Sequence, residues 1–324
     1  MTTLTMTYAE AAALALRDAM RADAAVVALG EDLGRGGVFG QYRGLQAEFG
    51  PARVIDTPIS EANIMGAAVG MALAGLRPVV EMRIIDFALC AMDELVNQAA
   101  KNRYMFGGQG RVPLVARMPI GIWSASAAQH SQSLEAWFAH LPGLVVVAPG
   151  TPQDNHGLLR AALASGDPVV YLEHKELWAE SGPVDPATDV PLGRAHRVCA
   201  GSDLTIVTWS RGLAPCLAAL DSPQLAGVGV DLLDLRSLWP WDREAVCASA
   251  ARSGALLVVH EAVQVAGYGA EIAAAVAEET GCRVARLGAP RIPVGYAPML
   301  EAEARLSPQK VAAAAAGLLR RMAR

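Results

Sequence analysis

Hydrophobic positions along the chain follow two alternating patterns, and their alternation predicts the order of the elements. Short apolar runs bounded by Gly, Pro, Asp or Ser indicate buried strands, whereas apolar residues at every third or fourth position indicate helices. The expected strands are 26–29, 53–55, 78–81, 112–117, 144–148, 167–174, 204–209, 228–235, 255–260 and 282–287. Because helical segments alternate with these strands, the chain is expected to have an α/β fold with parallel sheets covered on both faces.

Capping residues predict where several helices begin. Thr7 and Glu10 have the spacing of a capping box before a helix that ends near Arg21, and Thr151 precedes Pro152 at the start of another helix. Two further starts are expected at Asp86 for a helix over 87–104 and at Ser307 for the closing helix to 322. Helices are also expected over 242–253 and 269–279.

The stretch 56–81 combines an acid, a helix start and a smooth helix surface. Ser60 can cap this helix, Glu61 lies in its first turn and Gly75 can end it. The residues between are largely Gly and Ala, and each interior Gly costs about 1 kcal/mol relative to Ala. We therefore expect a neighbouring helix or subunit to approach closely. Glu61 is either a first-turn acid favoured by the helix dipole or a functional carboxyl.

Length and composition favour two domains. The chain has 324 residues, of which 53% are hydrophobic, which is enough for two ordinary cores. Residues 179–193 are rich in Pro, Asp and Gly and have no apolar period, so we interpret them as a linker. The expected organisation is therefore a domain over 1–178, the linker over 179–193, and a second domain over 194–324.

Charge and cysteine content exclude several classes of protein. The net charge is -5 and there is no Lys/Arg run, so neither a nucleic-acid partner nor a membrane surface is expected. The amino-terminal residues lack the features of a signal peptide, which makes the cytoplasm the expected location. Five dispersed cysteines without a CxxC pair argue against a disulfide framework and a zinc site.

Motif searches leave few candidate chemistries. The chain has no GxSxG, HExxH or GxxxxGK[ST] motif, and the GYGAEI segment at 267–272 lacks the third glycine of a dinucleotide-binding fingerprint. The glycine-rich loop 30–40 allows close approach of a ligand or partner, or is simply flexible. His130 lies in a polar, aperiodic loop over 118–137, where an imidazole can serve chemistry or be an ordinary loop residue.

A dozen segments occur in a characteristic order along the chain. They include GED, GGVF, RVIDTPISE, GLRPVVE, DF, NQAAKNRYMFGGQ, VPLV, AAQHSQSLEAW, PGLVVVAP, DPVVYLEH, DLRSLWP, AGYGAEIA and PMLE. With these segments the chain resembles the beta subunits of thiamine-diphosphate-dependent 2-oxoacid dehydrogenases, which act in the pyruvate, branched-chain and acetoin complexes. The resemblance covers essentially the whole chain. It implies a pyrimidine-binding transketolase-like domain followed by a transketolase C-terminal-type domain, each with a parallel sheet.

The resemblance assigns roles to three residues. Glu61 matches the acid that hydrogen-bonds the aminopyrimidine nitrogen of the cofactor, where sharing a proton helps the cofactor lose the proton of its reactive carbon. Phe87 matches the aromatic residue that stacks on the pyrimidine, although a core role is the alternative. His130 matches the histidine that faces the substrate and the arriving lipoyl group.

The diphosphate and magnesium motif of this family, GDG followed by an Asn, does not occur here. The resemblance therefore implies that an alpha subunit supplies the diphosphate and Mg²⁺ ligands, most simply in an alpha2beta2 heterotetramer, and that this chain binds no metal. The chain also departs from the family at Asp93-Glu94, where Asp-Gln is usual, and at Arg83 and Ile85.

The implied activity is oxidative decarboxylation of a small 2-oxoacid, with acyl transfer to lipoyl-lysine of an acyltransferase core. Pyruvate is the first choice, because NQAAKNRYMFGG and EHKELW are more similar to pyruvate and acetoin members than to branched-chain ones. Acetoin and branched-chain substrates remain alternatives. A non-catalytic assembly partner is the alternative from another class, and retention of Glu61, Phe87 and His130 argues against it.

Overall fold

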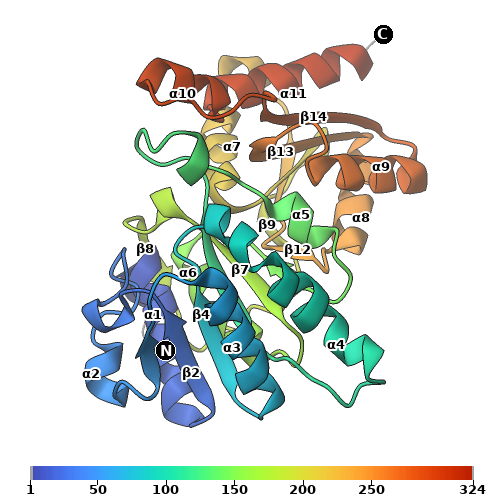
Figure 1. Ribbon diagram of the computed structural model, residues 1–324. Coiled ribbons are helices and arrows are strands. Elements are labelled where there is room, and N and C mark those ends of the chain that lie inside the picture. The colour runs from blue at the N-terminus through green and yellow to red at the C-terminus, as the bar shows by residue number, and fades with distance from the viewer. Residues whose placement is uncertain (1–2, 323–324) are drawn as a thin grey trace. The chain divides into compact units, whose positions relative to one another are not determined.

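The computed structural model describes residues 3–322, which form two compact units (Figure 1). The first unit contains the residues up to Ile120 together with Trp137–Leu192. The second unit contains Gly121–Ala136 and the residues from Gly193 onward. The segment 121–136 thus belongs with the C-terminal half of the chain, whereas the bounds expected from the sequence, 1–178 and 194–324, stay a prediction.

The first unit is built on a parallel sheet. Its parallel strands lie in the order β6-β7-β5-β4-β2-β3. The strands of the first unit are β1 (Leu4–Thr7), β2 (Val26–Gly30), β3 (Val54–Asp56), β4 (Arg77–Glu81), β5 (Val115–Ile120), β6 (Val145–Val147), β7 (Val169–His174) and β8 (Ser181–Val184). Its helices are α1 (Tyr8–Ala22), α2 (Leu45–Phe49), α3 (Glu61–Leu73), α4 (Ala100–Met105) and α6 (Pro152–Ala164).

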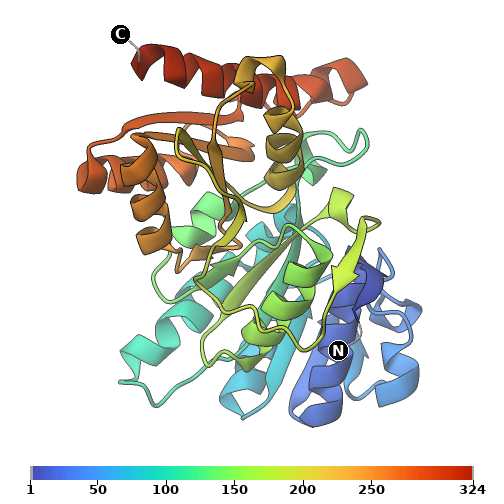
Figure 2. The same ribbon diagram turned by 180° about the vertical axis from the view of Figure 1, so that it is seen from behind.

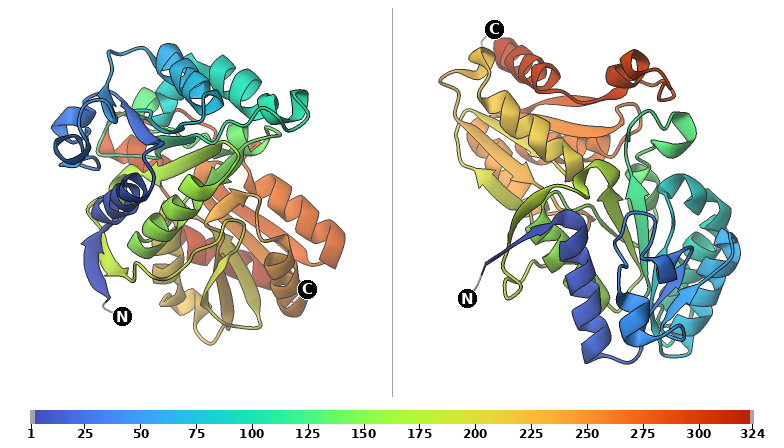
Figure 3. Two further views of the ribbon diagram at one scale, coloured as in Figure 1. Left: turned by 90° about the horizontal axis from the view of Figure 1, so that it is seen from below. Right: turned by 90° about the vertical axis from the view of Figure 1, so that its left-hand side faces the viewer.

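Helices cover both faces of this sheet. On one face α1 and α6 lie side by side, as Figures 2 and 3 show, and their buried residues join those of the strands in one core. On the other face α3 packs against β4 and against the helical segment 85–105. Strands β1 and β8 form a separate antiparallel pair in which Leu4 lies opposite Val184. The covered parallel sheet confirms the expected α/β class.

The second unit has its own sheet, in the order β14-β13-β10-β11-β9, with β9 antiparallel to β11 and the other pairs parallel. Its strands are β9 (His196–Cys199), β10 (Leu204–Thr208), β11 (Val230–Asp234), β12 (Ser237–Trp239), β13 (Ala255–Val263) and β14 (Arg283–Ala289). Its helices are α7 (Leu213–Leu220), α8 (Arg243–Ser253), α9 (Gly269–Thr280), α10 (Pro298–Ala304) and α11 (Pro308–Met322), and α5 (Glu135–Ala139) bridges the two units in sequence. Residues of α7 and α11 share a core with β10, β11 and β13.

The predicted caps at Thr7 and Thr151 are confirmed. Thr7 and Glu10 form the capping box of α1, and the side chain of Thr151 accepts a backbone N–H bond at the start of α6. The helix expected over 242–253 is α8, for which Asp242 is the cap residue. Ser60, in contrast, makes no side-chain cap bond at the start of α3, so that prediction was wrong.

The prediction of a single helix over 87–104 was also wrong. The chain instead forms a 3₁₀ helix at Ile85–Ala91, a π-helix at Asp93–Ala99 and then α4. Asp86 lies inside the 3₁₀ helix, whose N-cap residue is Ile84, so its expected position at the start of the helix was wrong. Such irregular helical turns occur where tertiary packing or function overrides the regular pattern. Here the segment packs along α3.

The stretch 179–193 has more structure than its composition predicts. It contains β8, and Val190 is buried in the core of the first unit, where a Cβ on Gly157 would lie 2.4 Å from a Val190 methyl. Within residues 3–322, no helix has both the length and the apolar character needed to cross a membrane.

Candidate functional site

Three neighbouring parallel strands end at one edge of the first sheet, and each is followed by a candidate residue. Strand β2 lies between β3 and β4. Glu31 follows β2, Glu61 begins α3 after β3, and Phe87 lies in the 3₁₀ helix after β4. The carboxyl ends of parallel strands share one edge, which is where open α/β sheets bind ligands. The topology therefore gathers these three side chains at a typical ligand-binding edge.

Glu61 and Phe87 lie on segments that contact each other. Helix α3 packs against the 3₁₀ helix Ile85–Ala91, and both side chains are half-buried. A half-buried carboxyl can share a proton with a ring nitrogen, and a half-buried aromatic ring can stack on a flat heterocycle. The structure therefore brings together two segments that carry an acid and an aromatic ring.

A second acid, Glu31, lies beside Glu61 and was not among the residues expected at the site. It is 9% exposed, and burial raises the pKa of its carboxyl, opposed by Arg83 and reinforced by the charge of Glu61. Arg83 Nη1 lies 3.5 Å from Glu31 Oε2 and 3.2 Å from Asp32 Oδ2. The sequence did carry a signal for Glu31, because its GED segment directly follows a buried strand.

The glycine-rich loop after β2 packs closely against the protein itself. A Cβ on Gly30 would lie 2.8 Å from the backbone oxygen of Glu81, and one on Gly34 would lie 2.4 Å from Asp56 Oδ2. The Gly34 N–H donates to Asp56 Oδ1 at 2.7 Å. The loop is therefore anchored at these positions by close contacts with its own chain, whereas close approach of a ligand or partner stays a prediction.

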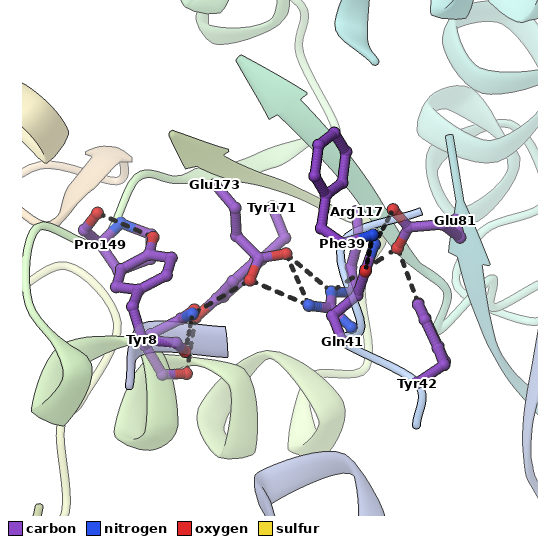
Figure 4. A network of polar contacts seen from close by, with 10 residues as sticks. Tyr8, Phe39, Gln41, Tyr42, Glu81, Arg117, Pro149, Tyr171 and Glu173 are labelled. Carbon is purple, nitrogen blue, oxygen red and sulfur yellow. Dashed lines mark hydrogen bonds and ion pairs between the residues drawn. The ribbon is translucent and has the colours of Figure 1, made fainter. Parts of the chain in front are cut away.

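A buried polar network at Glu81, the last residue of β4, holds the far end of this loop (Figure 4). Gln41 Nε2 donates to Glu81 Oε1 at 3.0 Å, and the Tyr42 hydroxyl donates to Oε2 at 2.8 Å. The Gln41 side chain in turn accepts the Phe39 N–H at 2.9 Å. Residues 39–42 are thus tied to the carboxyl edge of the sheet through one carboxyl group.

Arg117 of β5 connects this carboxyl to a second one. It is completely buried and donates through Nε and Nη2 to the two oxygens of Glu173 on β7, at 2.8 and 2.9 Å. Glu81 lies farther away, at 4.0 Å from Arg117 Nε. Two carboxyls therefore share one guanidinium, and Glu173 makes the better ion pair with it. Burial raises the pKa of Glu81 to about 7, a rise that Arg117 opposes and Glu173 reinforces.

His130 belongs to the second unit, within the segment Gly121–Ala136. It is exposed at the end of a short 3₁₀ turn, Ala128–His130. The end of this segment is fixed by Glu135, whose Oε1 accepts the Trp209 Nε1–H at 3.1 Å. The structure thus groups Glu61 and Phe87 in one unit and places His130 on an anchored segment of the other.

The GYG segment that resembles part of a dinucleotide fingerprint has a packing role. A Cβ on Gly267 or Gly269 would lie 2.7 Å from ring atoms of His260, which is buried on β13 and stacks on Trp209. The two glycines are therefore needed for close packing around the imidazole.

Comparison with domain families matches both halves of the chain. Residues 5–180 match the transketolase pyrimidine-binding domain, and residues 193–311 match the transketolase C-terminal domain. The residues discussed above from Glu31 to Glu173 fall within the first match.

Several proteins are similar over nearly the whole chain. A mitochondrial pyruvate dehydrogenase E1 beta subunit of Oryza sativa is 40% identical over 91% of this chain and 81% of its own length. The 2-oxoisovalerate dehydrogenase beta subunit of Bacillus subtilis is 38% identical, covering 95% and 97%. The acetoin:2,6-dichlorophenolindophenol oxidoreductase beta subunit of Cupriavidus necator is 39% identical, covering 93% and 94%.

Among solved structures, a split-gene transketolase described as an inactive beta4 tetramer matches with a TM-score of 0.82 and 23% identity. The match covers 97% of this chain and 98% of that chain. At this identity the match shows the fold alone, and it confirms the expected pair of transketolase-like domains.

Proposed function

Because the chain belongs to the transketolase-type family of beta subunits of 2-oxoacid and acetoin dehydrogenases, we propose that it is the beta subunit of a thiamine-diphosphate-dependent pyruvate dehydrogenase. The observation that supports this most is that the segments carrying Glu61 and Phe87 contact each other at the carboxyl edge of the first sheet. An acid that can share a proton and an aromatic ring that can stack are what an aminopyrimidine requires.

Each site residue has a distinct proposed task. When bound, thiamine diphosphate supplies the nucleophilic carbon and the electron sink for decarboxylation. Glu61 shares a proton with the pyrimidine nitrogen, and Phe87 orients the ring by stacking on it. His130 gives a proton to the sulfur of the lipoyl group, since an imidazole can act as a general acid.

An alpha subunit is proposed to complete the site. The chain lacks the GDG motif, so we assign the diphosphate and Mg²⁺ ligands to that partner in an alpha2beta2 heterotetramer. The acyl acceptor is the lipoyl-lysine of an acyltransferase core. The cytoplasmic location stays a prediction, because the similar proteins include mitochondrial and bacterial ones.

Pyruvate is the proposed substrate, and branched-chain 2-oxoacids and acetoin are the alternatives. The similar proteins carry all three names at 38–40% identity, so they do not separate the three. A non-catalytic role in assembly is the alternative of a different class.

The test is co-expression of this chain with the neighbouring reading frame. Cofactor binding is followed by quenching of tryptophan fluorescence, and turnover by reduction of a dye with pyruvate, 3-methyl-2-oxobutanoate or acetoin. We expect the isolated chain to be inactive, and the mixed assembly to bind thiamine diphosphate and to use pyruvate with the highest kcat/KM. Faster turnover of another substrate would replace pyruvate, and an assembly inactive with all three would support the non-catalytic role. Activity of the isolated chain equal to that of the assembly would refute the half-site proposal.

A further inference from the structure

The segment that carries His130 has an irregular and strained backbone. Ser124, Ala125 and Ala127 have φ angles of 41°, 56° and 59°, in the left-handed region that residues other than glycine rarely adopt. Such conformations persist only where surrounding contacts hold them. The shape of the segment therefore depends on its anchors.

Two acids from distant parts of the second unit supply these anchors. Glu261 of β13 accepts the Ile122 N–H through Oε1 at 2.8 Å. Glu301 of α10 accepts the Ala125 N–H through Oε2 at 2.7 Å, at the centre of the strained turn. Hydrogen bonds from backbone N–H groups to a carboxylate are shorter and stronger than neutral ones. Figure 1 shows the segment, in green, lying next to α10.

Glu301 is itself held in place. It is 6% exposed, and its Oε1 accepts from Arg305 Nε and Nη2 at 2.9 and 2.7 Å, which compensates the buried charge. The end of α10 is fixed by Lys310 of α11, whose Nζ donates to the carbonyl of Glu303 at 2.9 Å. Ile122 also packs against Ala304 of the same helix. The carboxylate therefore reaches Ala125 from a rigid support.

We propose that Glu301 is a positioning residue, which fixes the turn at 124–127 and thereby places His130 for transfer to the lipoyl group. The effect on lipoyl transfer rests on the proposed function, whereas the anchoring of the turn by Glu301 does not depend on it. Under this proposal α10 supports the reaction through Glu301, although no residue of α10 needs to contact the substrate.

The anchoring is tested by hydrogen exchange and mass spectrometry on the full chain, read on peptides that cover 121–133. Glu301→Ala removes the acceptor, and exchange at Ala125 should rise roughly 10- to 100-fold. Glu301→Gln keeps an oxygen that can accept the same N–H and should restore most of the protection. Glu303→Gln is the matched control, because this exposed residue lies on the same helix and its hydrogen bond with Lys310 uses its backbone carbonyl.

Two exchange results would overturn the proposal. One is unchanged exchange at 121–133 in Glu301→Ala. The other is equally faster exchange in β10 and β13, since Glu301 would then support the whole unit and not the turn.

The consequence for the reaction is tested on the assembly with its alpha subunit and a free lipoyl domain. Glu301→Ala should lower lipoyl acylation about tenfold with little change in dye reduction, and should add no further loss in a His130→Ala background. An additional loss in that background would show that Glu301 does not act through His130. If the wild-type assembly acylates no lipoyl domain, the proposed function is wrong. The hydrogen-exchange result then still decides whether Glu301 fixes the turn at 124–127.

Discussion

The buried carboxyl of Glu81 should make the stability of the protein depend on pH in an unusual direction. Burial raises its pKa from the ordinary value of 4.5 to about 7 in the folded protein. Between these two values the folded state keeps a proton that the unfolded state has released, so the free energy of unfolding falls as the pH rises. The stabilisation from the protonated Glu81 is fully present below the pKa of the unfolded state. It is lost as the pH rises through the higher pKa of the folded state.

The magnitude follows from the two pKa values. Between about pH 5 and about pH 8, linkage predicts that this one group lowers the free energy of unfolding by about 2.5 kcal/mol. Glu81→Gln removes the titration and resembles the protonated form, since the Tyr42 hydroxyl can accept a hydrogen bond as well as donate one. The variant should therefore be more stable than the wild type by about 1 kcal/mol near the lower pH and by about 3.5 kcal/mol near the higher pH.

Urea unfolding at both pH values, followed by circular dichroism, measures this difference. Glu180→Gln serves as the control, because Glu180 is an exposed carboxyl of the same unit. Subtracting the wild-type curve removes the contributions of all other titrating groups. A Glu81→Gln difference that is the same at both pH values would show that Arg117 keeps Glu81 ionised throughout, and the explanation given for the network would be refuted.

Three further predictions concern the site and its support. Glu61→Gln should fold and assemble normally but lose at least about 100-fold in turnover, because the amide cannot share the proton; retention of more than about a tenth of the wild-type rate would return Glu61 to a helix-dipole role. His130→Ala should keep most dye reduction while losing most lipoyl acylation, and equal losses in the two assays would instead assign His130 to substrate binding. Arg117→Met should lower the free energy of unfolding by about 3–5 kcal/mol, since it leaves two carboxyls buried without their cation; a loss below about 1 kcal/mol in urea unfolding would contradict the ion-pair description.

Local signals in the sequence were sufficient for much of the fold. The caps at Thr7 and Thr151 depend on residues three positions apart, and the buried strands are continuous apolar runs. Ser60 failed as a cap although its residue type is suitable. The prediction of one helix over 87–104 was wrong because packing along α3 determines the geometry of this segment. That packing is not visible in the local sequence pattern.

The site was predictable only where a motif marks it. Glu61 and Phe87 were found because the resemblance assigned them, and the structure then placed their segments in contact. The partnership of Glu81 with Arg117 depends on strand order, which places β4 next to β5. The grouping of 121–136 with the second unit depends in turn on acceptors such as Glu301, 176 residues away from Ala125. Long-range pairing of this kind leaves no periodic trace in a single sequence.

The pairing of β1 with β8 has a consequence for the order in which the protein can fold during its synthesis. Leu4 lies opposite Val184, and the apolar face of α1 is covered by α6. At ribosomal speeds of about 5–20 residues per second, the amino-terminal strand waits roughly 10–35 s for its partner to emerge. Until α6 emerges, which takes up most of that interval, the face of α1 that α6 covers is open to chaperones and to other nascent chains. The first unit is therefore completed late, by a segment that its sequence alone suggested was only a linker.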